Sequence, residues 1–210
     1  MRLRLLIAAI VLGAAFAGGI YIASNDRENS VHNITGLLWP DPPVLGSFSL
    51  VDSKGNALTE RNLQGRWTMV FFGFTNCPDI CPTTLATLNH VYTNLQSNQK
   101  IFEKVQVLFV SVDPERDDNE KLQAYVDYFN SAFIGATADD ERIKQFTGHF
   151  GVAYFKVNIP GPTGYSMDHT ASVLLVDPQL RFVGIFSQPH EGTDITRRLV
   201  QIISFIEGAG

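Results

Sequence analysis

The run WTMVFFGF, residues 67–74, carries no charged side chain and leads almost directly into the chain's two cysteines, Cys77 and Cys81. Eight residues are too few for a typical helix, and the run is rich in residues that favour strands, so it predicts a buried strand of a parallel sheet. A helical pattern follows the cysteines, and a buried strand followed by a helix is typical of an α/β fold. We therefore expect both cysteines at a strand-to-helix turn.

Two prolines in the segment Cys77-Pro78-Asp79-Ile80-Cys81-Pro82 indicate where the turn ends and the helix begins. Pro78 disfavours the helical conformation at Cys77, which places Cys77 in the loop. Pro82 suits the first helical position, which places Cys81 at or beside the helix N-cap. The sulfur of Cys81 would then face the positive end of the helix dipole, which favours its thiolate.

The remaining sequence alternates between patterns typical of strands and of helices. Strands are predicted at residues 48–51, 57–58, 105–112, 133–137, 153–158, 172–177 and 182–187. Helices are predicted at residues 82–96, 119–129, 139–149 and 194–207. Residues 159–168 contain two prolines and two glycines and are predicted to form a loop. This order predicts an α/β fold, with a mixed β-sheet and helices on both of its faces.

The N-terminal segment differs from the rest of the chain. In residues 1–23 two arginines precede an apolar run that is long enough to span a bilayer. We expect a transmembrane anchor in residues 1–23, a linker in residues 24–43 and one globular domain in residues 44–210. Ala15-Phe16-Ala17 also resembles a cleavage site, so a removed signal peptide is the competing interpretation.

Charge limits the expected location and partners. The arginines before the apolar run place the N-terminus in the cytoplasm and the domain outside it. Because no transit-like leader precedes the run, we expect a single-pass protein of a bacterial inner membrane, with its C-terminal domain in the periplasm. The net charge of −5, without a Lys/Arg cluster beyond the first residues, gives no support for nucleic-acid binding.

Three chemically distinctive positions fall at one edge of the predicted sheet. The cysteine turn follows the strand 67–74, and Asp113 follows the next strand. Open α/β sheets bind ligands at the carboxyl ends of their strands. His169, which immediately precedes the strand 172–177, could reach the same edge from its loop. The sequence thus predicts two thiols and one imidazole close together.

Four stretches resemble the signature sequences of the SCO/SenC family. They are FGFTNCPDICP at residues 72–82, VDPERD at 112–117, DHTAS at 168–172 and VDP at 176–178. They occur in the family's order, and the similarity covers about residues 44–207. A CxxxC pair alone is a weak signal, whereas CPDICP followed by DHTA is a specific one.

The resemblance implies a fold, a metal and a role. SCO/SenC proteins are membrane-anchored, thioredoxin-like (peroxiredoxin-like) copper chaperones for cytochrome c oxidase. The family's copper ligands fall on Cys77, Cys81 and His169. The resemblance therefore implies a metallochaperone rather than an enzyme, with room for an accessory thiol-disulfide reductase activity. Such a chaperone delivers copper to the copper A site of the oxidase's copper-binding subunit, and another periplasmic copper carrier is a candidate partner, although the sequence leaves the copper donor open.

The chemistry of these side chains agrees with the resemblance. Thiolates select Cu(I), and imidazole suits either copper oxidation state. Three protein ligands leave a coordination position open, whereas structural zinc sites normally have four. A disulfide would bring the two sulfurs to about 2 Å, so oxidation of this redox-active pair would exclude copper.

Four further residues are candidates for supporting or partner-facing roles: Asp79, Asp113, Asp168 and Met167. The alternative for Asp79 and Asp113 is that they are ordinary turn and strand-end residues. Asp168 either fixes its loop or orients the imidazole of His169. The thioether of Met167 is a candidate for transient copper contact during handover.

Alternative functions remain for the cysteine pair. A purely structural disulfide would close so short a loop that it would add only roughly 2 kcal/mol. A thiol-disulfide oxidoreductase would use Cys77, the more exposed thiol, to attack and Cys81 to resolve. The usual thioredoxin pair has two intervening residues rather than three, which favours metal binding. A peroxidase would carry a threonine three residues before its reactive cysteine, and this chain does not.

Overall fold

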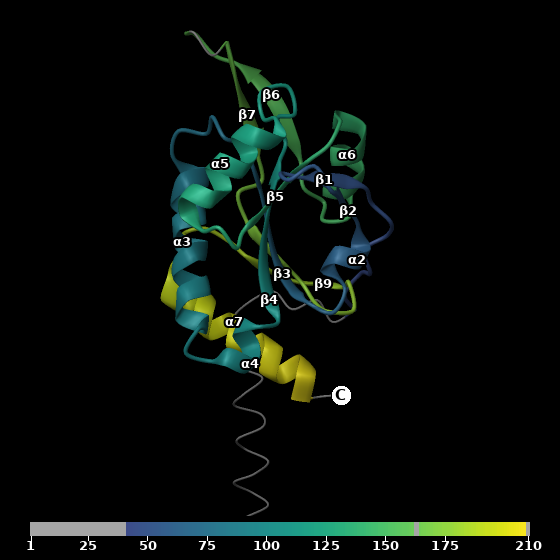
Figure 1. Ribbon diagram of the computed structural model, residues 1–210, viewed down its shortest axis with the longest axis vertical. Coiled ribbons are helices and arrows are strands. Elements are labelled where there is room, and N and C mark those ends of the chain that lie inside the picture. Colours follow the sequence, from purple (N-terminus) through teal and green to yellow (C-terminus); the bar gives the residue numbers. More distant parts are fainter. Residues whose placement is uncertain (1–40, 162–163, 209–210) are drawn as a thin grey trace, which may run out of the picture. The chain divides into compact units, whose positions relative to one another are not determined.

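Seven strands form one mixed sheet in the computed structural model, which describes residues 41–161 and 164–208 (Figure 1). The order across this sheet is β2-β1-β5-β4-β3-β8-β9, and β6 pairs with β7 in a separate two-stranded sheet. The strands are β1 (Leu50–Asp52), β2 (Ala57–Leu58), β3 (Trp67–Gly73), β4 (Val105–Ser111), β5 (Ile134–Thr137), β6 (Tyr154–Asn158), β7 (Tyr165–His169), β8 (Val173–Val176) and β9 (Phe182–Phe186). The helices are α2 (Glu60–Leu63), α3 (Ile80–Leu95), α4 (Gln99–Phe102), α5 (Asn119–Phe129), α6 (Asp140–Gly148) and α7 (Gly192–Gly208).

The apolar run is the central strand β3. All seven of its residues are buried, and it lies parallel to β4 on one side and antiparallel to β8 on the other. A strand with neighbours on both edges and helices over both faces has no solvent-facing side, which explains its continuous apolar sequence. The prediction of a buried parallel strand is confirmed.

Helices cover both faces of the sheet, as predicted (Figure 1). On one face the ring of Phe72 packs against Phe146 of α6, with ring centroids 5.7 Å apart. On the other face Phe71 packs against Phe109, which in turn contacts Tyr125 of α5. Adjacent residues of β3 thus bury their side chains in opposite layers, because successive side chains of a strand point to opposite faces.

The prediction of a loop at residues 159–168 is wrong in its second half. Tyr165–His169 form β7, which pairs antiparallel with β6 from Tyr154↔His169 to Asn158↔Tyr165. The sequence of β7 is YSMDH, whose residues are all half-buried or exposed, so it lacks the apolar alternation that marks a strand. Helices α2 and α4 were also missed, because four residues are too few to show a helical period.

The predicted anchor in residues 1–23, and the predicted linker up to residue 40, lie outside the described residues. Within residues 41–161 and 164–208, no helix has both the length and the apolar character needed to cross a bilayer.

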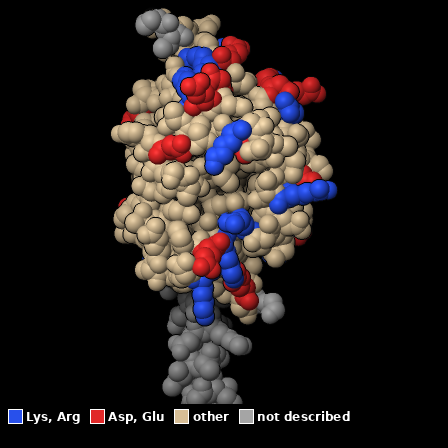
Figure 2. Space-filling model, viewed as in Figure 1, with Lys and Arg blue, Asp and Glu red and all other residues tan. Residues whose placement is uncertain are grey.

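Charged side chains of opposite sign are interspersed on the face drawn in Figure 2. Exposed ion pairs of the described residues include Lys104 with Glu207 and Arg142 with Asp139. Exposed pairs of this kind contribute roughly 0–1 kcal/mol each, so stability rests on the buried layers on either side of β3.

Candidate metal centre

The cysteine turn connects β3 to α3, as the sequence predicts. Asp79 is the N-cap of α3, which begins at Ile80, two residues before the predicted start at Pro82. Proline is tolerated there because the first-turn N–H groups of a helix have no intrahelical partner. Cys77 therefore lies in the loop and is partly exposed, whereas Cys81 lies in the first helical turn and is buried.

A buried carboxylate holds the loop that precedes Cys77. Asp117 is 1% exposed and accepts a hydrogen bond from the backbone N–H of Thr75 at 2.8 Å. It also accepts bonds from the hydroxyls of Thr75 and Ser111. These contacts fix the start of the cysteine turn to the end of β4. Asp117 lies within the stretch VDPERD, but no spacing rule links it to Thr75, so this role was not predictable from the sequence.

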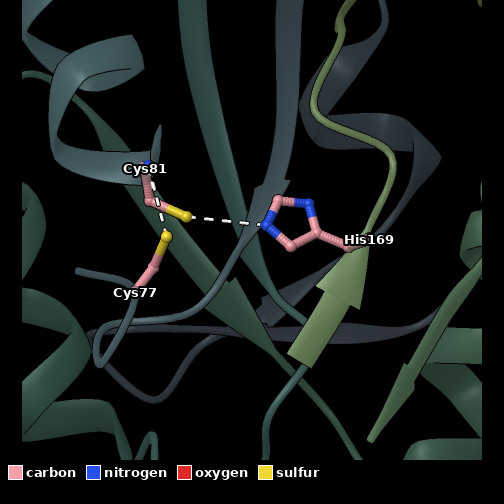
Figure 3. Close-up of side chains that lie close together, drawn as sticks. All are labelled: Cys77, Cys81 and His169. Atoms are coloured by element: carbon pink, nitrogen blue, oxygen red, sulfur yellow. Dashed lines mark hydrogen bonds between the residues drawn. The ribbon is translucent and has the colours of Figure 1, made fainter. Parts of the chain in front are cut away.

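His169 reaches the cysteines from the last position of β7. Its Nδ1 lies 3.1 Å from the carbonyl oxygen of Thr170, to which an Nδ1–H can donate a hydrogen bond, and in that tautomer Nε2 keeps its lone pair. Nε2 faces the sulfur of Cys81 at 3.6 Å (Figure 3). The rings of Phe71 and Phe74 stand edge-on to the imidazole at 6.2 and 6.0 Å, so they form its walls.

The structure brings together the three side chains that the sequence singled out. One donor atom from each of Cys77, Cys81 and His169 lies within 4.8 Å of the other two, and the three point toward a common centre (Figure 3). Two sulfurs and one imidazole nitrogen at this spacing could hold a metal ion. Among the described residues this is the one cluster of three or more His, Cys, Asp or Glu side chains with that geometry.

The two thiols titrate in opposite directions. The pKa of Cys77 is lowered to about 4, first because the side chain of Cys81 donates a hydrogen bond to its sulfur. His169 and the backbone N–H groups of Cys81 and Asp79 act in the same direction, against the effect of partial burial. The pKa of Cys81 is raised, first by its hydrogen bond to Cys77 and then by its own burial. Cys77 is therefore the thiolate, and Cys81 keeps its proton.

This result corrects the prediction that the helix N-terminus favours a thiolate at Cys81. The backbone N–H of Cys81 points at the sulfur of Cys77 at 3.3 Å. Free N–H groups of the first turn point away from the helix toward the residues that precede it. The positive end of the dipole therefore acts on the residue before the helix, which is Cys77.

The sequence profile of the SCO1/SenC family matches residues 40–204. The chain belongs to this family. Protein SCO1 homolog 1, a mitochondrial protein of Arabidopsis thaliana, is 36% identical over 201 residues, which cover 92% of this chain and 59% of that protein. This SCO1/SenC chain thus spans less than two thirds of the length of that relative.

Solved structures of SCO proteins share the fold. The copper-bound structure of ScoI from Arabidopsis thaliana is 35% identical, with a TM-score of 0.72 over 77% of this chain and 98% of that one. Copper-bound ScoI from Bradyrhizobium japonicum is 34% identical, with a TM-score of 0.67 over 76% and 99%. Both relatives bind copper, and the predicted thioredoxin-like α/β architecture matches theirs.

The four further candidates lie around the centre rather than in it. Asp79 is exposed at the N-cap, where it accepts a 3.4 Å hydrogen bond from the Thr83 hydroxyl. Asp113 is 2% exposed and is paired with Arg116. Met167 is half-buried against the core.

Asp168 is exposed and lies on the opposite face of β7 from Met167 and His169, because side chains alternate along a strand. The sequence left open whether Asp168 orients the imidazole. In the structure Nδ1 of His169 pairs with the Thr170 carbonyl instead.

Proposed function

We propose that this protein is a copper metallochaperone that binds copper through Cys77, Cys81 and His169. The observation that carries the proposal is the convergence of two sulfurs and one imidazole nitrogen within 4.8 Å, from two places in the sequence that lie 88 residues apart. The donor set fits copper, because thiolates select Cu(I) and imidazole accommodates both oxidation states. Its membership of a family with copper-bound relatives supports the same metal.

The arrangement also suits transfer. Three protein ligands leave one coordination position free for a ligand of the recipient. Cys77 is partly exposed and is already deprotonated, so its sulfur can engage copper without first losing a proton. Cys81 must lose a proton to bind, and Nε2 of His169 lies beside it at 3.6 Å. Copper loading should therefore release about one proton from the centre near neutral pH.

The recipient and the location belong to the same proposal. We assign delivery to the copper-binding subunit of cytochrome c oxidase on the basis of the SCO/SenC signatures. The apolar run in residues 1–23 supports a membrane anchor, with the domain in the periplasm. Asp79 and Asp168 are exposed close to the cysteine turn and to His169, which makes them candidates for contact with a recipient or a copper donor.

Copper titration of the reduced full-length protein tests the proposal. Replacement of His169 by Ala should lower the affinity for Cu(II) and weaken the thiolate-to-Cu(II) absorption band. His90→Ala is the matched control, because His90 is an exposed histidine on α3 outside the three-residue cluster. Equal Cu(II) affinity in the wild type and in His169→Ala would refute the three-ligand site.

A second function, thiol-disulfide oxidoreductase, is favoured by one observation, the low pKa of the partly exposed Cys77. The Cys77 thiolate would attack one sulfur of a partner disulfide and form a mixed disulfide. Cys81 would lose its proton and attack Cys77, which releases the partner as a dithiol. Two electrons pass to the partner, and the Cys77–Cys81 disulfide forms.

The two functions differ in their dependence on His169. Reduction of a partner disulfide requires both cysteines, whereas copper binding also requires the imidazole. His169→Ala could leave both the rate of reduction of a model disulfide and the copper affinity at their wild-type values. This result would indicate an oxidoreductase. Loss of copper affinity with retained reduction would show that both activities share the cysteine pair.

A further inference from the structure

The third donor is carried by a hairpin that stands apart from the main sheet. β6 and β7 pair with each other and with no strand of the seven-stranded sheet (Figure 1). His169 is the last residue of β7. Strand pairing therefore does not fix β7 to β3, which leads into the cysteine turn. The chain joins the main sheet again at β8, which begins four residues after His169 and pairs with β3. Further contacts hold the other end of β7 and can also act on the position of His169.

One such contact is a cluster of three side chains, Asp113, Arg116 and Tyr165, which we call the Arg116 clasp. Nε of Arg116 donates to Oδ2 of Asp113, and its Nη1 donates to the backbone carbonyl of Tyr165 at 3.0 Å. The hydroxyl of Tyr165 donates to Oδ1 of Asp113 at 2.8 Å. The guanidinium carbon lies 3.7 Å from the centroid of the Tyr165 ring. The clasp thus joins the first residue of β7 to the loop after β4.

The same guanidinium also reaches the wall of the metal centre. Its carbon lies 5.7 Å from the centroid of the Phe74 ring, and Phe74 stands edge-on to His169. Arg116 therefore contacts the strand that carries the imidazole and the ring that bounds it. The route through Tyr165 leads to His169 along β7. Phe74 contacts the imidazole with its ring, and its backbone also bonds to Cys77.

Burial makes the clasp stiff and specific. The side chain of Asp113 is 2% exposed and that of Arg116 is 17% exposed, so separation of the pair would leave a buried charge without its partner. A lysine at position 116 could keep the charge but could not bind Asp113 and the Tyr165 carbonyl and also stack on the tyrosine ring. Nη2 of Arg116 is buried without a hydrogen-bond partner in the described part of the chain. The bonds to Asp113 and to the Tyr165 carbonyl hold the guanidinium in place although its Nη2 has no partner there.

We propose that Arg116 is a positioning residue for the third copper ligand. Through the clasp it holds β7 so that Nε2 of His169 faces Cys81. The proposal rests on the proposed function, in which His169 binds copper. Since imidazole matters more for Cu(II) than for Cu(I), which two thiolates alone can hold, loosening the clasp should affect Cu(II) more.

A double-mutant comparison in the full-length protein separates positioning from general stability. Cu(II) affinity is measured for Arg116→Lys in the wild-type and in the His169→Ala background. We expect a loss of about 10- to 100-fold with His169 present, in line with changes to groups that orient metal ligands, and nearly no loss after His169→Ala. The Cu(II) absorption of Arg116→Lys should approach that of His169→Ala, while Cu(I) affinity changes less.

The matched control is Arg142→Lys, which alters an Arg–Asp pair on α6. It should leave Cu(II) affinity unchanged in both backgrounds. If Arg116→Lys fails to fold, Tyr165→Phe removes the 2.8 Å bond to Asp113 but keeps the ring, and it should give a smaller loss of the same kind.

Three outcomes contradict the positioning role. Cu(II) affinity could be unchanged by Arg116→Lys, or it could fall equally in both backgrounds, which would indicate a general structural effect. If His169→Ala alone leaves Cu(II) affinity intact, the proposed copper site itself fails. The first two outcomes leave the copper site standing, so the two failures are distinguishable.

Discussion

Gly73, the last residue of β3, provides a test that links packing to the metal centre. A Cβ atom at this position would lie 2.7 Å from Cε2 of Phe109 and 2.9 Å from the sulfur of Cys81. Contacts between carbon atoms are comfortable at roughly 3.5–4.0 Å. In the Gly73→Ala variant, the distances from the new Cβ to the Phe109 ring and to the Cys81 sulfur must therefore each grow by roughly 0.6 to 1.3 Å, through movement of the ring, the sulfur or the strand.

The surroundings limit how this displacement is absorbed. Phe109 is fully buried and packs against Phe71 and Tyr125, so its ring has little room to move. Overpacking of a core typically costs about 1–3 kcal/mol. Replacement of glycine returns about 0.4–1 kcal/mol by restricting the unfolded chain. The midpoints of these two ranges give a net loss of about 1.3 kcal/mol in the free energy of unfolding.

Gly135→Ala is a matched control for this loss. Gly135 is also buried in a strand, and a Cβ there would lie 2.9 Å from Cγ of Leu122 and 3.2 Å from Val126, far in sequence from the cysteine turn. Urea unfolding of the reduced proteins should show similar losses for the two variants. Copper affinity should fall about 10- to 100-fold for Gly73→Ala alone, because a donor shift beyond about 0.2 Å disturbs a metal site.

The reasoning fails if the two variants behave alike toward copper. Wild-type copper affinity in a destabilised Gly73→Ala protein would mean that Cys81 is not a ligand in the geometry described here. Wild-type stability of Gly73→Ala would instead mean that the layer between β3 and α5 yields more easily than its burial indicates.

The thiolate of Cys77, the carboxylate of Asp117 and the imidazole of His169 can each be tested separately. Because the pKa of Cys77 lies near 4, its thiolate persists as pH falls below 7, and alkylation by iodoacetamide should stay fast at pH 6. Cys81→Ala should raise the pH at which the alkylation rate of Cys77 is half-maximal. A half-maximal pH near 8.5 in the wild type would contradict a thiolate at Cys77. Asp117→Ala leaves three buried or half-buried donors without an acceptor, so the free energy of unfolding in urea should fall by about 2–4 kcal/mol. An unchanged urea midpoint would contradict the role of Asp117 in holding the cysteine turn. Copper at 100 times its Kd should stabilise the reduced fold by about 2.7 kcal/mol, and His169→Ala should reduce the increase in Tm at a fixed copper concentration; an equal increase in both proteins would contradict ligation by His169.

Much of the fold could be predicted from short-range patterns. The sequence of β3 predicts a strand that is buried on both faces, and α5 begins and ends at the predicted residues, 119 and 129. The turn between β3 and α3 follows from Pro78 and Pro82, which restrict the backbone whatever the rest of the chain does. Features that depend on local conformational limits are therefore readable in one sequence.

Contacts between distant segments were not readable in this way. Asp117 and Thr75 lie 42 residues apart, and Arg116 and Tyr165 lie 49 apart. Nothing in the polar sequence of β7 shows that it pairs with β6, since its partner and its burial are set by the rest of the fold. The three ligand candidates were found because their chemistry is distinctive, whereas the residues that hold them are ordinary.

Which of the two cysteines is the thiolate could be decided only from the structure. Spacing alone placed Cys81 at the helix N-terminus and gave it the thiolate. In the structure, the hydrogen bond to Cys77 and then burial raise the pKa of Cys81, while the backbone N–H of Cys81 helps to stabilise the anion of Cys77. The partly exposed sulfur is therefore the charged one, and the buried sulfur stays neutral beside His169. In the proposed copper site, Cys77 would offer copper a deprotonated ligand, whereas Cys81 would first have to lose its proton.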